Sequence, residues 1–279
     1  MVESVAEVRA ARANAPGPIG LVPTMGYLHD GHMSLVAHAR AECATALVSI
    51  FVNPTQFGPA EDFARYPRDP ERDLRLCERA GVDVVFAPSV SEMYPGNHAT
   101  YVEVEGIQDR WEGASRPGHF RGVATVVARL FRIALPDRAY FGEKDYQQLQ
   151  IIRRMVDDLL LDVHVVACPT VREPDGLAMS SRNAYLDDAA RQRATALSVA
   201  LRQAQRLLAT GNRSGPDLAA AMRRVIDATP GVELDYAAVV HPATLDPVEI
   251  VKSEARALIA ARVAGVRLID NAPLVPTVL

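Results

Sequence analysis

The sequence predicts an α/β fold, in which a domain built on a parallel sheet is followed by a smaller α+β domain. Short apolar runs alternate with segments of helical periodicity, and the first of them form a strand–helix–strand unit. Such a unit is typical of a parallel sheet with a right-handed crossover. The pattern changes near residues 174–187, where long helical periodicity begins and three strand-like runs follow. We therefore expect one domain over residues 1–175 and a second over residues 176–279.

The first domain is expected to begin with a helix and then to alternate strands with helices. Residues 2–14 have helical periodicity, and Pro16-Gly17-Pro18 ends that helix,. Asp69 and Pro70 are typical of the N-cap and first turn of a helix, and Gly81 is typical of a helix end. Strands are predicted at 19–22, 46–52, 82–87, 138–141 and 163–167, and helices at 32–42, 70–80, 123–134 and 145–160.

Two segments of this domain lack a clear helix or strand pattern. Residues 91–95 are predicted to form a turn,. Residues 113–122 are rich in glycine and basic residues, which indicates either a loop that orders over an anionic substrate or a plain surface loop. The second domain is expected to contain helices at 187–210 and 215–229 and strands at 232–240, 258–263 and 266–269,.

Composition indicates a globular protein with a large core. The chain has 279 residues, of which 49% are hydrophobic and 23% are charged, and its net charge of −4 gives no electrostatic case for nucleic acid,. No apolar segment is long enough to span a bilayer, and the acidic N-terminus is unlike a signal peptide. The three cysteines match no metal or redox spacing,. Reduced thiols and a cytoplasmic location are therefore expected.

The stretch from Pro23 to His32 carries the strongest chemical signal. It joins the first predicted strand to a helix and contains two glycines and two histidines. A helix N-terminus supplies N–H groups and the positive end of the helix dipole, both of which suit phosphate. His29 and His32 are three residues apart, so both can donate hydrogen bonds to one anion. A metal site is disfavoured because no further Cys or His cluster lies nearby in the sequence.

Polar loops follow several of the other predicted strands. Ligands of open α/β sheets bind beyond the carboxyl ends of the strands, so these loops are expected to share one crevice. Gln56 follows the second strand and suits a small hydroxy acid, while Asn53 either joins it or only shapes the turn,. Lys144 follows the fourth strand and can track developing phosphate charge. Ser180, Ser181 and Arg182 form a further anion-binding group,.

Taken together, these segments resemble the pantoate–β-alanine ligase (pantothenate synthetase) family of the H-x-G-H nucleotidyltransferase superfamily. The resemblance covers nearly the whole chain, and long motifs in the right order are more specific than H-x-G-H alone. The resemblance implies a Rossmann-like first domain and a lid role for the second. The motifs are PTMGYLHDGH at 23–32, FVNPTQF at 51–57, YPR at 66–68, FGEKDYQQL at 141–149, PTVRE at 169–173, GLAMSSRN at 176–183, AARV at 260–263 and RLIDN at 267–271.

The resemblance also implies a reaction. ATP and pantoate would give pantoyl adenylate and pyrophosphate, and the amine of β-alanine would then displace AMP to give pantothenate. His32 would be the proton donor of the family or, with His29, would stabilise phosphate charge, and Lys144 would stabilise developing charge. The residues expected to bind ATP are Met25, Gly26, Tyr27, Leu28, His29, Asp30, Gly31, His32, Gly142, Glu143, Lys144, Asp145, Val171, Met179, Ser180, Ser181 and Arg182.

Pantoate is expected to contact Gln56 and Gln148, and Gln56 would lie near β-alanine as well. The resemblance also places Val126 and Val127 against the gem-dimethyl group of pantoate. Mg²⁺ would accompany ATP, bound mainly by phosphate oxygens and water. The resemblance offers Asp73 as one protein ligand, but many relatives have two adjacent acids there and this chain has Arg72 beside Asp73, so no metal ligand is firmly assigned. The family is dimeric, so a homodimer is expected, with no nucleic acid or membrane partner.

Two other functions use the same motifs. A nucleotidyltransferase that adenylylates a phosphorylated alcohol would need both phosphate motifs, but Gln56 and Gln148 favour a hydroxylated carboxylate substrate. A non-catalytic nucleotide- or RNA-binding module would not need His29, His32, Lys144, Ser180 and Arg182 together. The absence of a basic bias also counts against RNA.

Overall fold

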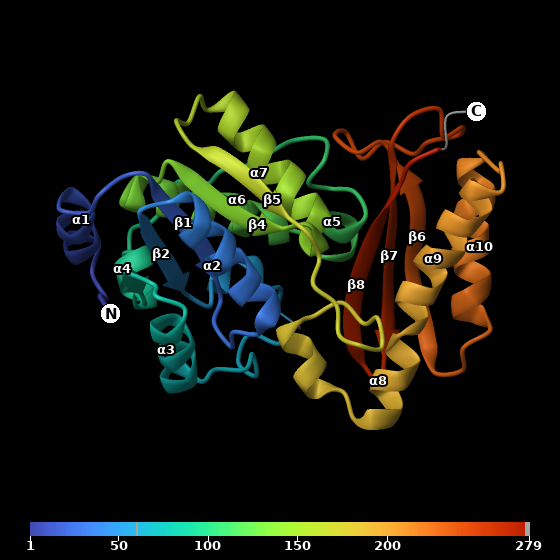
Figure 1. Ribbon diagram of the computed structural model, residues 1–279, viewed down its shortest axis with the longest axis horizontal. Helices are drawn as coiled ribbons and strands as arrows, with labels where there is room; N and C mark the ends of the chain where they lie inside the picture. The colour runs from blue at the N-terminus through green and yellow to red at the C-terminus, as the bar shows by residue number, and fades with distance from the viewer. Residues whose placement is uncertain (60, 277–279) are drawn as a thin grey trace. The chain divides into compact units, whose positions relative to one another are not determined.

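The structure is a computed structural model that describes residues 1–59 and 61–276. The chain divides into two compact units (Figure 1). The first contains residues 1–143 and 147–169, and the second contains residues 144–146 together with the chain from Thr170 onward. Within the described residues, no helix is both long and apolar enough to cross a membrane.

The first unit is built on a parallel sheet of five strands in the order β3-β2-β1-β4-β5. From β1 the chain moves outward to β2 and β3, and then returns to place β4 on the other side of β1. The strand order therefore reverses between β1 and β4, where α/β sheets typically bind ligands. The strands are β1 (Ile19–Thr24), β2 (Thr45–Ile50), β3 (Val84–Phe86), β4 (Arg138–Gly142) and β5 (His164–Cys168).

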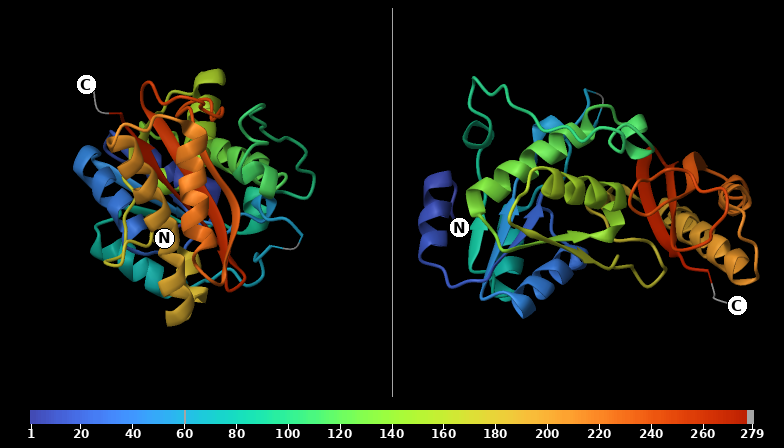
Figure 2. Two further views of the ribbon diagram at one scale, coloured as in Figure 1. Left: turned by 90° about the vertical axis from the view of Figure 1, so that its right-hand side faces the viewer. Right: turned by 90° about the horizontal axis from the view of Figure 1, so that it is seen from above.

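Helices cover both faces of this sheet, as expected for a parallel sheet (Figure 2),. Side chains that alternate along β1 enter different cores: Leu21 joins the core with α1, α6 and α7, whereas Val22 joins the core with α2 and α3,. The helices are α1 (Val5–Ala13), α2 (Asp30–Glu42), α3 (Pro70–Arg79), α4 (Val90–Met93), α5 (Glu112–Ser115), α6 (His119–Ala134) and α7 (Tyr146–Asp158).

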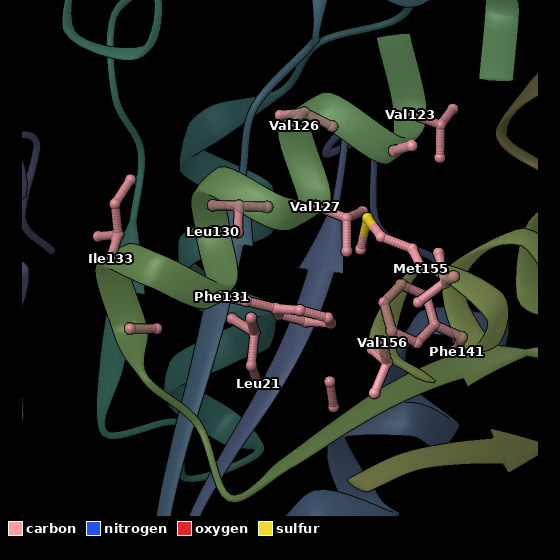
Figure 3. Close-up of a cluster of buried hydrophobic side chains, with 14 of the residues drawn as sticks. Leu21, Val123, Val126, Val127, Leu130, Phe131, Ile133, Phe141, Met155 and Val156 are labelled. Atoms are coloured by element: carbon pink, nitrogen blue, oxygen red, sulfur yellow. The ribbon is translucent and has the colours of Figure 1, made fainter. Parts of the chain in front are cut away.

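The larger of these two cores lies between α6, α7 and the sheet (Figure 3). Phe131 of α6 meets Phe141 of β4 edge to face, with ring centroids 6.4 Å apart,. Val126 and Val127 are both buried members of this cluster. Burial of α6 against the sheet accounts for its apolar face without reference to a ligand.

Three local predictions differ from the structure. Helix α2 begins at Asp30, with His29 as its N-cap, which is two residues earlier than expected. Residues 91–95 were expected to form a turn, but most of them belong to α4, whose N-cap Ser89 accepts from Glu92 N–H,. Residues 113–122 are not a simple loop, because α5 ends at Ser115 and α6 begins at His119 after the left-handed Gly118,.

The second unit has two layers, a three-stranded antiparallel sheet and the helices that cover one face of it (Figure 1). Helix α9 packs against β7 and β8, and α10 packs against β6. The predicted α+β class is therefore confirmed. Its elements are α8 (Asp188–Ala194), α9 (Ala196–Ala209), α10 (Gly215–Asp227), β6 (Val232–Val240), β7 (Ala255–Val263) and β8 (Val266–Leu274).

Candidate active site

The predicted site residues are distributed over both units. The first unit carries Met25–His32, Gln56, Gly142, Glu143 and Gln148. The second carries Lys144, Asp145, Val171 and Met179–Arg182. In the first unit, β1 pairs directly with β4, so the turn after Thr24 and the end of β4 at Gly142 lie at the same edge of the sheet. This edge is the point where the strand order reverses, which is the position expected for a nucleotide.

The two histidines of the turn are adjacent and oriented by one hydrogen bond. His29 is the N-cap of α2, and its backbone N–H donates to Nδ1 of His32 at 3.3 Å. The two rings are 4.0 Å apart between centroids. Because Nδ1 of His32 accepts, a neutral His32 carries its proton on Nε2. In that tautomer, Nε2 of His32 is a hydrogen-bond donor, and it lies on the side of the ring opposite the bond to His29.

Side chains satisfy the backbone N–H groups of the turn itself. Gly26 N–H donates to Oγ1 of Thr24 at 3.2 Å. Tyr27 and Leu28 donate to the two carboxylate oxygens of Asp73, each at 2.7 Å. The N–H groups of Gly26, Tyr27 and Leu28 are therefore occupied, and the prediction of phosphate-binding N–H groups now rests on the start of α2. There, the first residues of a helix have no intrahelical acceptor.

Gln56 lies in η1 (Pro54–Gln56), the turn after β2, and its side chain is held from two sides. Nδ2 of Asn53 donates to Oε1 of Gln56 at 3.0 Å, and Nε2 of Gln56 lies 3.1 Å from Sδ of Met25. The structure therefore brings Gln56 against the histidine turn, as the sequence predicted for loops at neighbouring strand ends. Asn53 shapes the turn, because its Oδ1 accepts from Thr55 N–H, and it also orients Gln56.

A cluster that the sequence interpretation missed supports the same turn. Nδ1 of His119 lies 2.8 Å from the carbonyl oxygen of Gln56, and Nε2 of His119 lies 3.1 Å from the guanidinium of Arg116. Arg116 also forms ion pairs with Glu61 at 2.6 Å and with Glu112. Burial and the adjacent Arg116 lower the pKa of His119 to about 4. His119 is therefore neutral near pH 7, donating to Gln56 and accepting from Arg116.

The two adjacent glutamines at the start of α7 have different surroundings. Gln147 is buried and donates to the carbonyl oxygens of Ile107 and Arg110 at 2.6 and 2.9 Å. It therefore anchors the segment before α5. Gln148 is half-buried, and it is the glutamine that the resemblance assigns to pantoate. The geometry is consistent with a structural Gln147 and leaves Gln148 for a ligand.

In the second unit, the side chains of Asp270 and Asn271 on β8 each hold one predicted nucleotide segment. Nδ2 of Asn271 donates to the carbonyl oxygen of Lys144 at 2.8 Å, and its Oδ1 accepts from Arg256. Arg256 also lies over the ring of Tyr146, 4.1 Å from its centroid,. These contacts fix the backbone of Lys144, whose ammonium lies 3.9 Å from Oδ1 of Asp145.

Asp270 holds the segment that contains Val171 and Met179–Arg182. Its carboxylate accepts two hydrogen bonds from Arg172, at 2.6 and 2.9 Å, and it is 4% exposed,. Met179 N–H donates to the carbonyl oxygen of Val171 at 3.0 Å, which closes the segment into a narrow turn. Ser180 caps η3 (Ser181–Tyr185) by accepting from Arg182 N–H at 3.3 Å. The sequence offered RLIDN as a motif but gave Asp270 and Asn271 no role.

The described residues form no cluster of three or more metal-ligating side chains. Within residues 1–59 and 61–276, no three His, Cys, Asp or Glu side chains gather in a way that could hold a metal ion. Asp73, the candidate considered from the sequence, is 1% exposed, and both its oxygens already accept backbone N–H groups. Cys43, Cys77 and Cys168 are free, buried and far apart in the sequence.

Comparison with known protein families identifies the family of this chain. The family model described as pantoate-beta-alanine ligase matches residues 1–273. The chain belongs to the pantoate–β-alanine ligase family. A pantothenate synthetase from Roseiflexus sp. (strain RS-1) is 57% identical over 274 residues, which is 98% of this chain and 99% of that protein.

Solved structures of pantoate–β-alanine ligases have the same fold. The pantothenate synthetase from Thermus thermophilus is 53% identical, with a TM-score of 0.95 and 99% of each chain covered. The enzyme from Francisella tularensis was crystallised in complex with beta-gamma ATP and β-alanine. It is 35% identical, with a TM-score of 0.81 over 97% of this chain and 96% of that one. The Rossmann-like sheet and the antiparallel second unit are therefore those of a pantoate–β-alanine ligase.

Proposed function

We propose that this chain catalyses the ATP-dependent condensation of pantoate and β-alanine to pantothenate. The observation that carries the proposal is membership of the pantoate–β-alanine ligase family over nearly the whole chain, combined with the paired histidines at the sheet edge where strand order reverses. The Francisella tularensis relative bound with an ATP analogue and β-alanine supports the choice of two of the three substrates.

The reaction has two steps whose atoms balance without a redox partner. A carboxylate oxygen of pantoate attacks the α-phosphorus of ATP, and the bond from that phosphorus to the bridging oxygen breaks, releasing pyrophosphate. The neutral amine of β-alanine then attacks the carbonyl carbon of pantoyl adenylate. The C–O bond to AMP breaks, and the amine proton is lost as the amide forms. The groups needed are therefore cations and donors for the phosphates and polar groups for the two acids.

The first unit supplies the groups proposed for the start of this reaction. Nε2–H of His32 and the first N–H groups of α2, at Asp30 and Gly31, are proposed to donate to phosphate oxygens, which the His29–His32 hydrogen bond supports,. Met25, Gly26, Tyr27 and Leu28 shape the turn that carries them. Gln56 and Gln148 are proposed to bind pantoate, and the contacts of Gln56 to Asn53 and Met25 support a fixed orientation,.

The second unit supplies further groups proposed to contact the nucleotide. Gly142 and Glu143, which belong to the first unit, are proposed to contact it as well. The ammonium of Lys144 would follow the charge that develops on the phosphates, because its backbone is fixed while its stem stays flexible,. Ser180, Ser181 and Arg182, with Asp145, Val171 and Met179, form the remaining nucleotide contacts. In functional terms, residues 1–175 would bind nucleotide and pantoate, and residues 176–279 would act as a lid.

Mg²⁺ is proposed to accompany ATP, bound by phosphate oxygens and water, since the described side chains do not offer it a site of their own,. A homodimer and a cytoplasmic location are proposed from the family. The experiment that tests the function is product analysis with ATP, pantoate and β-alanine, omitting each in turn. Pantothenate and AMP should form in equal amounts only when all three are present. Formation of ADP in place of AMP would overturn the adenylate route.

A further inference from the structure

Asp73 lies in the first turn of α3, and its side chain accepts hydrogen bonds from the turn after β1. Oδ2 accepts from Tyr27 N–H and Oδ1 from Leu28 N–H, both at 2.7 Å and across at least 45 positions of sequence. The carboxylate is 1% exposed. Two charge-assisted bonds of this length to consecutive backbone groups fix the position and orientation of the peptide units that donate them.

The turn that donates these hydrogen bonds has an unusual backbone conformation, which the carboxylate stabilises. Gly26 and Tyr27 have φ values of +83° and +49°, in the left-handed region that a residue with a side chain seldom adopts,. A Cβ on Gly26 would approach Oδ2 of Asp73 to 3.0 Å, so the carboxylate and the turn are closely packed. Immediately after Leu28 comes His29, the N-cap of α2, whose N–H orients His32. The carboxylate therefore binds the residue that directly precedes the histidine pair.

A metal-binding role would require different geometry. Mg²⁺ prefers an octahedral set of oxygens at about 2.1 Å and usually keeps several waters. The buried carboxylate of Asp73 has both oxygens engaged and no exposed edge for a hydrated ion. Its sequence neighbour is a cation, with the guanidinium of Arg72 3.9 Å from Oδ1 and over the ring of Tyr27. The site therefore fits a carboxylate that binds the backbone.

We propose that Asp73 is a positioning residue, which holds the Tyr27–Leu28 turn so that His29, His32 and the start of α2 are aligned for the nucleotide, and that it is not a metal ligand. This inference rests on the proposed function, because it assigns the turn to ATP. Asp73 would act on adenylation only through the backbone of residues 27–29.

The test compares Asp73→Asn with a matched control. The amide retains one acceptor, but its NH₂ group faces the second backbone N–H, so one hydrogen bond is lost. Glu71→Gln makes the same chemical change in the first turn of the same helix, at a side chain that is 88% exposed. If Asp73→Asn does not fold, Asp73→Glu serves instead, since its longer side chain cannot place both oxygens on the same N–H groups.

Two readouts separate this proposal from the proposed function. Amide hydrogen exchange without substrates should accelerate at Tyr27 and Leu28 by roughly tenfold or more in Asp73→Asn but not in Glu71→Gln. Unchanged exchange there would overturn the positioning role whether or not the protein is a ligase. Pantoate-dependent exchange of pyrophosphate into ATP should slow by roughly 10²-fold in kcat. The Mg²⁺ concentration for half-maximal rate should stay constant, and a several-fold increase in it would instead identify Asp73 as a metal ligand.

Discussion

Asn53 donates a hydrogen bond from its side-chain amide to Oε1 of Gln56 at 3.0 Å, and the same nitrogen donates to the carbonyl oxygen of Gly122 at 3.1 Å. Oδ1 of Asn53 accepts from Tyr94 at 2.9 Å. Asn53 is therefore saturated with protein partners, while Gln56 keeps its Nε2 donor directed toward Met25. Asn53 therefore supports the turn, and Gln56 is the residue predicted to contact pantoate.

Replacing Gln56 by alanine should weaken pantoate binding far more than ATP binding. In the proposed site, the side chain would supply an amide donor to a hydroxylated carboxylate, and its recorded contact with the histidine turn is to the Met25 side chain,. Loss of one such hydrogen bond to a charged group corresponds to roughly a tenfold to 10²-fold increase in KM for pantoate. Steady-state kinetics with each substrate varied in turn would measure it. An unchanged KM for pantoate would remove Gln56 from the pantoate site.

Asn53→Asp should have a related but indirect effect. The carboxylate keeps the acceptor used by Thr55 and Tyr94 but replaces the donor to Gln56 with an oxygen. Gln56 Oε1 would then face a carboxylate oxygen, so the amide should rotate and lose its orientation. KM for pantoate should rise in this variant. The Asn53→Asp, Gln56→Ala double variant should have the same KM as Gln56→Ala alone. Additive losses would show that Asn53 acts independently of Gln56.

Lys144→Ala should reduce the rate of adenylation strongly while leaving the fold intact. The main-chain carbonyl that Asn271 binds remains in the variant, which removes the ammonium, its stem and its ion pair with Asp145. If that charge stabilises the transition state, kcat for pyrophosphate exchange should fall by roughly 10²-fold or more. Lys144→Arg offers a charged comparison. Turnover close to that of the unmodified protein in Lys144→Ala would exclude the side chain from the mechanism.

Asp270→Asn should destabilise the protein and impair nucleotide binding together. Asp270 is buried and pairs bidentately with Arg172, whose side chain is partly exposed, so we expect a loss of about 2 kcal/mol in the free energy of unfolding,. Asp158→Asn breaks the exposed pair with Arg154 on α7 and should cost less than about 1 kcal/mol,. Urea unfolding of the two variants provides the comparison. Equal losses would argue against Asp270 as the anchor of the Val171–Arg182 segment.

The buried His119 predicts a pH dependence of stability. Its pKa is about 4 in the folded chain, below the usual value of 6.5, so between these values the unfolded chain binds more protons,. The free energy of unfolding should therefore fall as pH decreases from 6.5 to 4, by on the order of 3 kcal/mol. His119→Asn keeps a donor for Gln56 but does not titrate, so its slope should be shallower. His164→Asn, at an exposed histidine on β5, should keep the full slope.

Local patterns were sufficient to predict most of the elements and the polar loops at strand ends. The run before Pro23 predicts β1 because a short apolar run bounded by turn residues is typical of a buried strand,. Asp69-Pro70 predicts the start of α3 because helix capping depends only on neighbouring residues,. The family resemblance supplied the reaction, and the comparisons confirm the family. The roles of individual site residues remain predictions.

Other features depend on contacts between distant residues and could not be predicted. The pairing of β1 with β4 places the histidine turn where strand order reverses, but strand order is not encoded in any one segment. The glycine-rich sequence at 113–122 suggested a loop. The contacts of His119 with Gln56 and Arg116 could not be predicted, because Gln56 is distant in the sequence. Asp73 was considered as a metal ligand from the family resemblance, and its partners Tyr27 and Leu28 could not be predicted because they lie far away in the sequence.

The central claim is that the chain activates pantoate as an acyl adenylate. Pantoate-dependent exchange of labelled pyrophosphate into ATP, measured without β-alanine, tests this claim most directly because only a reversible adenylation step returns the label to ATP. We predict rapid exchange that requires pantoate, falls sharply when Lys144 is replaced by alanine, and is followed by pantothenate and AMP when β-alanine is added. ATP binding without exchange would contradict the account, and exchange without amide formation would assign the chain to adenylyl transfer alone.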